Sequence, residues 1–338
     1  MGANVADTGM TARSDRLHAI DTAKGVGIFL VVFGHAWRGV YDAGLLQDAS
    51  LFRTVDTLIY TWHMPLFFFL SGLLYLNVLQ KVAAGPFFVS RFRRLLWPLA
   101  LWTWLFFGLK LLAGSAANRP VNLADFPLIP LPPYEHLWFL WALFLAQIIV
   151  LIAYVALKDR LSAMQMRVGL GLTAVLFTLT IPFLYVPSPT FGAAVEHFPY
   201  FIAGVALGGL AHLKPPTWLA VAAAVLFGLL IWQAPYGPAS LVVSLALTAL
   251  ACIVIFKLDS NIPAPTAPIA LLRFLGLYSL PIFLAHTIFS AAFRIALRMS
   301  GVEMLSVHLL VATLVGLAGP IFLVWISDRL NISKLLGF

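Results

Sequence analysis

Ten apolar segments follow one another along this 338-residue chain, with short polar stretches between them. A helix of about 20 apolar residues can cross the hydrocarbon core of a bilayer, where only helices and closed barrels satisfy their backbone hydrogen bonds. With 62% hydrophobic and 10% charged residues, the chain cannot be a soluble globular protein or a nucleic-acid-binding protein. We therefore predict an all-α polytopic membrane protein with about ten transmembrane helices, at residues 22–40, 57–79, 92–113, 136–157, 167–186, 197–212, 217–233, 239–257, 274–296 and 305–327.

These helices leave room for one transmembrane domain, at residues 16–338. The polar residues 1–15 lack the apolar core of a signal peptide, so they are expected to form a cytoplasmic tail. The segment 197–212 is short and contains glycine, and Pro281 interrupts the ninth segment. Both segments are expected to form broken or re-entrant helices that line a cavity.

Basic residues concentrate on alternate connections between the apolar segments. The side of a membrane protein that faces the cytoplasm carries the excess of Lys and Arg. Placing both termini inside puts 15 of the 21 basic residues on the cytoplasmic face and seven of the 13 acidic residues on the opposite face. The distribution of the net charge of +8 thus indicates the orientation of a multi-pass protein. The protein is expected in the plasma (inner) membrane. No nucleic-acid partner is expected.

Histidines are the main ionisable groups inside the predicted spans, and such groups usually face a protein interior or a watery cavity. His35 lies roughly 16 Å beyond Lys24 along the first helix, at or past the middle of the membrane. Five histidines are expected at similar depth: His35, His63, His136, His286 and His308. A single one would indicate a helix–helix hydrogen bond, whereas several together favour catalysis. No metal is expected, because no two of them have the i, i+3 or i+4 spacing of ligands on one helical face.

Three arginines, Arg91, Arg93 and Arg94, crowd into the expected short loop between the second and third spans. They are explained as an anchor on the cytoplasmic side, or alternatively as a phosphate-binding group. Arg91 and Arg94 lie three residues apart. If the third helix begins early, they share one face and can bind phosphate oxygens bidentately.

Aromatic residues are dense around two of the histidines. Trp62 precedes His63, and Trp138 follows His136 by two residues. Tryptophan is common where a helix meets the membrane surface, so each can be an interfacial anchor. Stacking against a carbohydrate ring is the functional alternative for Trp62 and Trp138.

Five motifs, in this order on the predicted spans, carry a resemblance to a known family. They are Lys24 followed after ten other residues by His35, Trp62-His63-Met64-Pro65, Arg91 with Arg94, His136-Leu137-Trp138, and Pro281-Ile282-Phe283-Leu284-Ala285-His286. Together they resemble the membrane acyltransferase family 3, most closely its fucose 4-O-acetylase-like branch. The resemblance covers essentially the whole chain.

The resemblance implies transfer of an acyl group, usually acetyl from acetyl-CoA, to a hydroxyl of a surface or exported carbohydrate. It implies catalytic roles for three histidines: His35, His63 and His286. It implies an acyl-CoA site made of three basic residues: Lys24, Arg91 and Arg94. With the aromatic residues described above, an acceptor site is expected to include Trp62, His136 and Trp138. The expected partners are therefore acyl-CoA, a carbohydrate acceptor and the lipid bilayer.

Two mechanisms and one rival function stay open on the sequence. His35 could act as a general base on the acceptor hydroxyl, or as a nucleophile that forms an acyl-histidine. The rival is a transporter or flippase for a glycan, a lipid-linked sugar or a small polar molecule, although no inverted pair of broken helices is visible. The sequence leaves open the identity of the glycan, the hydroxyl position, the acyl chain length and the oligomeric state.

Overall fold

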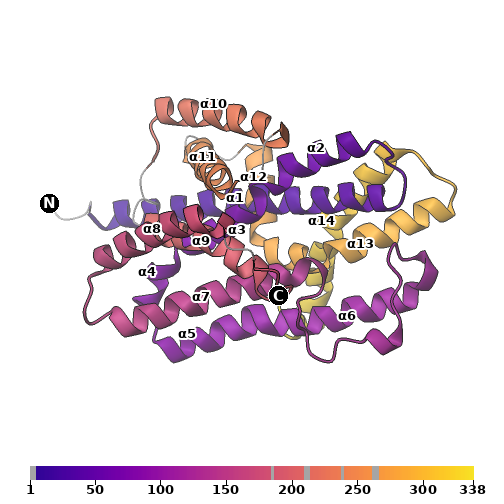
Figure 1. Cartoon of the computed structure of the whole chain (residues 1–338), viewed down its shortest axis with the longest axis horizontal. Coiled ribbons are helices and arrows are strands. Elements are labelled where there is room, and N and C mark those ends of the chain that lie inside the picture. The colour runs from indigo at the N-terminus through magenta and orange to yellow at the C-terminus, as the bar shows by residue number, and fades with distance from the viewer. Residues whose placement is uncertain (1–4, 184–185, 209–213, 237–239, 261–265) are drawn as a thin grey trace.

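The computed structural model describes residues 5–183, 186–208, 214–236, 240–260 and 266–338, and within these ranges every regular element is a helix (Figure 1). The α-helices are α1 (Val5–Asp42), α2 (Ala49–Tyr60), α3 (His63–Leu73), α4 (Tyr75–Leu79), α5 (Ala84–Arg91), α6 (Trp97–Ala113), α7 (Trp138–Leu157), α8 (Ala163–Thr180), α9 (Gly192–Leu207), α10 (Thr217–Gln233), α11 (Leu241–Ser260), α12 (Ala267–Leu277), α13 (Ser279–Met299), α14 (Leu305–Arg329) and α15 (Ser333–Leu336). The shorter helical pieces are η1 (Phe92–Leu96), η2 (Gly114–Ala116), η3 (Leu123–Asp125), η4 (Glu135–Leu137), η5 (Ile181–Phe183) and η7 (Ala234–Tyr236).

Nine helical stretches of the described chain are long and apolar enough to cross a membrane: His18–Asp42, Ala49–Leu79, Ala84–Ala116, Glu135–Leu157, Ala163–Phe183, Thr217–Tyr236, Leu241–Ser260, Ser279–Met299 and Leu305–Arg329. They confirm the predicted all-α polytopic fold. The predicted span 197–212 corresponds to α9, which has 16 residues and contains Pro199, while residues 209–212 lie outside the described ranges. From Val5 onwards, the expected tail is part of α1.

The predicted ninth span, 274–296, is divided between two helices. α12 ends at Leu277, and α13 begins at Ser279, with Tyr278 between them. Pro281 is the third residue of α13, where a backbone N–H would have no partner within the helix anyway. The break therefore lies three residues before the proline, because the first turn of a helix tolerates proline.

Glycines allow four helices to approach closely. Gly25 faces the backbone of α12, and Gly276 faces the backbone of α1. Gly72 faces the backbone of α9, and Gly204 faces the carbonyl oxygen of Phe69 in α3. Small residues at such crossings are typical of membrane helices, whose association depends on close packing. They hold α1 and α3, which carry two of the predicted histidines, in fixed positions.

Replacing Gly204 with alanine should destabilise the protein, because the added Cβ would overlap the Phe69 carbonyl. Overpacking of this kind costs about 1–3 kcal/mol. The melting temperature of the detergent-solubilised protein measures the loss. Gly228→Ala is the matched control, since a Cβ there meets no atom within 4 Å in the described chain. Equal melting temperatures for the two variants would contradict this packing.

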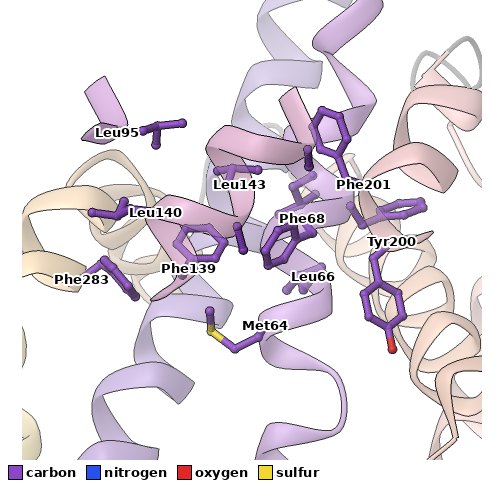
Figure 2. Close-up of a cluster of buried hydrophobic side chains, with 14 of the residues drawn as sticks. Met64, Leu66, Phe68, Leu95, Phe139, Leu140, Leu143, Tyr200, Phe201 and Phe283 are labelled. Atoms are coloured by element: carbon purple, nitrogen blue, oxygen red, sulfur yellow. The ribbon is translucent and has the colours of Figure 1, made fainter. Parts of the chain in front are cut away.

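The helices surround a dense aromatic and aliphatic core. α1 packs against α3, α11, α12, α13 and α14, while α10 lies outside α11 and α6 lies on the opposite side of the bundle (Figure 1). Side chains from α3, α7, α9 and α13 meet in this core, as Figure 2 shows for Met64, Leu66, Phe68, Phe139, Leu140, Leu143, Tyr200, Phe201 and Phe283. A cavity lies within this packing.

Candidate functional site

The cavity has a volume of about 280 Å³ and is lined by residues of α1, α3, α4, α5, η1, α7 and α13. Its basic side chains are Lys24, Arg91 and Arg94. Its aromatic rings include Phe139 and Phe283, which belong to the core drawn in Figure 2. The cavity therefore joins a cationic region to an aromatic one.

The three basic residues come from separate elements. Lys24 of α1 forms an ion pair with Asp21, with Nζ and Oδ1 3.1 Å apart. The Arg91 guanidinium lies 4.9 Å from the centre of the Phe87 ring, and its Nε is buried without a hydrogen-bond partner in the described chain. Arg94 is exposed. Two arginines and a lysine at one cavity can together bind a polyanion.

The prediction of a short loop around the three arginines is wrong. The helix already begins at Ala84, so Arg91 ends α5, and Arg93 and Arg94 lie in the π-helix η1. Pro86 does not prevent this start because it falls in the first turn. Single π-helical turns often mark functional sites. Arg91 and Arg94 both line the cavity, while Arg93 is exposed and does not line it.

A polar group interrupts the apolar wall of the cavity. The Tyr75 hydroxyl donates to the backbone carbonyl of Gln147, and Gln147 Nε2 donates to Ser71 Oγ at 3.1 Å. Gln147 Oε1 is buried without a partner in the described chain. It is therefore a free acceptor on a residue that lines the cavity. Sequence reasoning missed Gln147, although a polar residue in the middle of an apolar span is a signal of function.

Three of the predicted histidines meet beyond the aromatic end of the cavity. The centre of the His35 ring lies 5.0 Å from that of His286 and 5.6 Å from that of His136. The rings of His136 and His286 are 5.1 Å apart. These residues come from α1, η4 and α13, and we call them the histidine cluster. His63 joins it through Tyr60, whose ring lies 4.5 Å from His63 and 6.3 Å from His35.

Hydrogen bonds to backbone carbonyls orient the buried rings. A carbonyl only accepts, so His286 donates from Nδ1 to the carbonyls of Ile282 and Phe283, both at 2.9 Å. Its Nε2 then carries the lone pair and is buried without a partner in the described residues. His136 donates from Nε2 to the Phe283 carbonyl at 3.1 Å. His35 is only half-buried, and no hydrogen bond of its ring occurs within the described chain.

Sequence reasoning also missed an ion pair beside the histidine cluster. Arg38 forms a bidentate ion pair with Asp56, in which Nε donates to Oδ1 at 2.6 Å and Nη2 donates to Oδ2 at 2.8 Å. Its guanidinium lies 3.3 Å from the centre of the Tyr60 ring. The Tyr60 hydroxyl is buried without a partner in the described residues. Arg38 follows His35 by three residues, and Tyr60 follows Asp56 by four, so each pair shares a helical face.

Three other residues that the sequence analysis singled out make their contacts outside the histidine cluster. The Trp62 indole N–H donates to the Leu58 carbonyl at 3.1 Å, and its ring contacts Phe227 of α10. The Trp138 ring lies 4.8 Å from that of His197. His308 Nε2 donates to the Val302 carbonyl at 2.8 Å. Among the ring contacts of the described residues, none joins these three to the histidine cluster.

A single aromatic layer separates the cavity from the histidine cluster. Phe283 lines the cavity, and its ring lies 5.1 Å from His136 and 6.3 Å from His286. Phe139 packs against Phe283 with 5.3 Å between ring centres. The basic residues, the cavity, this layer and the histidine cluster therefore follow one another through the protein. In the described chain, no three His, Cys, Asp or Glu residues are placed to hold a metal ion.

These features define a polytopic helical membrane protein with a cationic cavity that ends against buried histidines. A family model described as an acyltransferase domain, that of acyltransferase family 3, matches residues 17–326. The chain therefore belongs to the membrane acyltransferase family 3. This confirms the resemblance at the level of the family, while the fucose 4-O-acetylase-like branch stays a prediction.

One curated relative is similar over part of the chain. The nodulation protein NolL of Mesorhizobium japonicum is 31% identical over 134 residues, which cover 39% of this chain and 34% of the relative. The matched region thus spans about a third of that protein's length. No solved structure matches the chain.

Proposed function

We propose that this protein transfers an acyl group, acetyl above all, from acyl-CoA to a hydroxyl of a surface or exported carbohydrate. The observation that carries the proposal is the cavity, which leads from Lys24, Arg91 and Arg94 to the aromatic layer in front of the histidine cluster. The protein is proposed to lie in the plasma (inner) membrane with these basic residues on the cytoplasmic side, where acyl-CoA is available.

The donor fits the cavity by its chemistry. Acyl-CoA is a polyanion with a long, thin pantetheine arm that contains amide groups. Arg91 and Arg94 can bind its phosphates through planar guanidinium forks, which match phosphate oxygens better than a lysine ammonium does. Gln147 Oε1 is an acceptor for a pantetheine amide N–H, because it lacks a partner in the described residues. The thioester then points toward Phe283 and the histidines.

The histidine cluster can supply the proton transfer. His35 takes the proton of the acceptor hydroxyl as its oxygen attacks the thioester carbonyl carbon. The new C–O bond forms, the C–S bond breaks, and the proton passes to the departing sulfur, so that the products are an O-acyl ester and the CoA thiol. His286, held by two backbone carbonyls, keeps its Nε2 lone pair in the cluster and can orient the His35 ring.

Release of CoA thiol tests this function. Purified protein incubated with acetyl-CoA should release thiol faster when a carbohydrate acceptor is present, and mass spectrometry should find the acetylated acceptor. Surface glycans from cells with and without the gene identify the natural acceptor by the same mass difference. Absence of both thiol release and acetylated glycan would overturn the proposal and favour a transporter or flippase.

Phe283→Ala should broaden the choice of acyl chain, because the ring closes the cavity at the aromatic layer. A methylene in an apolar pocket changes selectivity by roughly 10- to 200-fold. We expect the kcat/KM ratio of butyryl-CoA to acetyl-CoA to rise at least about tenfold. Leu143→Ala is the control, since Leu143 lines the cavity one turn of α7 beyond Phe139 and is not itself an aromatic ring of this layer. The same ratio in both variants would remove Phe283 as the end of the acyl site.

A further inference from the structure

Arg294 of α13 is a buried cation without an acceptor. Only 8% of its surface is exposed, and in the described chain no hydrogen-bond acceptor or carboxylate lies within bonding distance of its guanidinium. Asp42 attracts it from beyond that distance, but Asp42 pairs with Arg119 at 3.5 Å. Arg298 adds a repelling positive charge and donates to the Ala43 carbonyl at 3.3 Å.

The position of Arg294 relates it to the histidine cluster. Along α13, Phe283 lines the cavity, His286 belongs to the cluster, and Arg294 follows His286 by eight residues, about 12 Å further along the axis. Across the helix interface, Arg294 Nη1 lies against Gly39 of α1, one turn beyond His35. Arg294 is thus on the far side of the histidine cluster from the donor cavity.

A largely buried guanidinium that no acceptor binds is unfavourable, because the attraction of Asp42 compensates the loss of hydration only in part. Ionisable groups kept in such positions within membrane helices usually serve a ligand. The guanidinium presents five N–H donors in a planar fork that fits the two oxygens of a carboxylate or phosphate. Gly39 makes room for this fork on α1, because a Cβ there would lie only 2.4 Å from Nη1.

We propose that Arg294 binds an anionic group, a carboxylate or a phosphate, of the acceptor molecule. The acceptor hydroxyl would then reach the histidine cluster from the side opposite to the thioester. Naming the ligand as the acceptor rests on the proposed function, whereas the binding of an anion at Arg294 does not. The acceptor class that follows is an acidic or phosphate-linked carbohydrate.

Ligand-dependent stabilisation of the full-length protein in detergent tests the site. Glucuronate is compared with glucose, and inorganic phosphate with sodium chloride, at equal ionic strength. A ligand that binds only the folded state raises Tm, here by about 2 °C or more at saturating concentration. Arg294→Gln should abolish the rise. Arg298→Gln, an exposed arginine on the same helix, should keep it, as should the variant Arg91→Ala/Arg94→Ala, which removes the other anion site.

The pattern of shifts identifies the anion. A rise with glucuronate alone indicates a carboxylate, a rise with phosphate alone indicates a phosphate ester, and a rise with both leaves a site for either anion. No rise with either, or the same rise in Arg294→Gln, overturns the proposal. If Arg294→Gln does not fold, Gly39→Ala replaces it, because the new Cβ would lie 2.4 Å from Nη1 and displace the guanidinium. Thiol release from acetyl-CoA is measured separately, so failure of acyl transfer and failure of anion binding are distinguished.

Discussion

His35→Ala should reduce acyl transfer at least about 100-fold in kcat, because removal of a general base costs roughly 10²–10⁴ in rate. Folding should change little. The ring is half-buried, and no hydrogen bond of its nitrogens occurs within the described chain, so its removal leaves no polar partner unsatisfied. The measurement is steady-state turnover of acetyl-CoA with an acceptor, together with the Tm of the purified variant.

His308→Gln is the matched control for this prediction. His308 is fully buried and bonded to the Val302 carbonyl, but it makes no ring contact with the histidine cluster in the described chain. Its replacement should lower Tm and leave kcat near the wild-type value. Near-wild-type turnover in well-folded His35→Ala would contradict the assignment of the base and transfer the role to His286 or His63.

The double variant Arg91→Ala/Arg94→Ala should raise the KM for acetyl-CoA by at least about tenfold. Hydrogen bonds to charged groups contribute about 1.5–3 kcal/mol each, and both arginines line the cavity proposed to bind the donor. Lysine at either position should rescue binding only in part, because it lacks the planar fork. KM and kcat for acetyl-CoA measure the effect, which should fall mainly on KM.

Arg93→Ala separates donor binding from a general charge effect. Arg93 lies between the two arginines in sequence and shares the π-helix η1 with Arg94, yet it is exposed and does not line the cavity. Its removal should leave the KM unchanged. If Arg93→Ala raises KM as much as the double variant, or if the double variant has a wild-type KM, the arginines only anchor the helix at the membrane surface.

The helices were predictable because long apolar runs have few alternatives in a bilayer. Nine predicted spans match helices of sufficient length, with edges shifted by several residues. The third span was predicted from residue 92, with an earlier start as the alternative, whereas the helix begins at Ala84 because its first turn tolerates Pro86. A break near Pro281 was expected because proline interrupts a helix, and the structure places this break at Tyr278.

The candidate site was predictable in part. His35, His136 and His286 were expected at similar depth, and depth follows from counting residues along a helix. Which rings meet depends on how each helix is rotated about its axis. The contact of Trp62 with Phe227 of α10, away from the histidine cluster, could therefore not be predicted. Within the described residues, the Oε1 atom of Gln147 lacks a partner because of how neighbouring helices pack, which hydropathy does not encode.

Supplying donor and acceptor on opposite sides of the membrane tests the central claim most directly. The donor cavity and Arg294 lie on opposite sides of the histidine cluster, so the acyl group should cross within the protein. In proteoliposomes of one orientation, acetyl-CoA supplied only on the Arg91 side should acetylate an acceptor present only on the other side. Acetylation that requires both substrates on one side, or passage of unmodified acceptor without acyl transfer, would contradict the account.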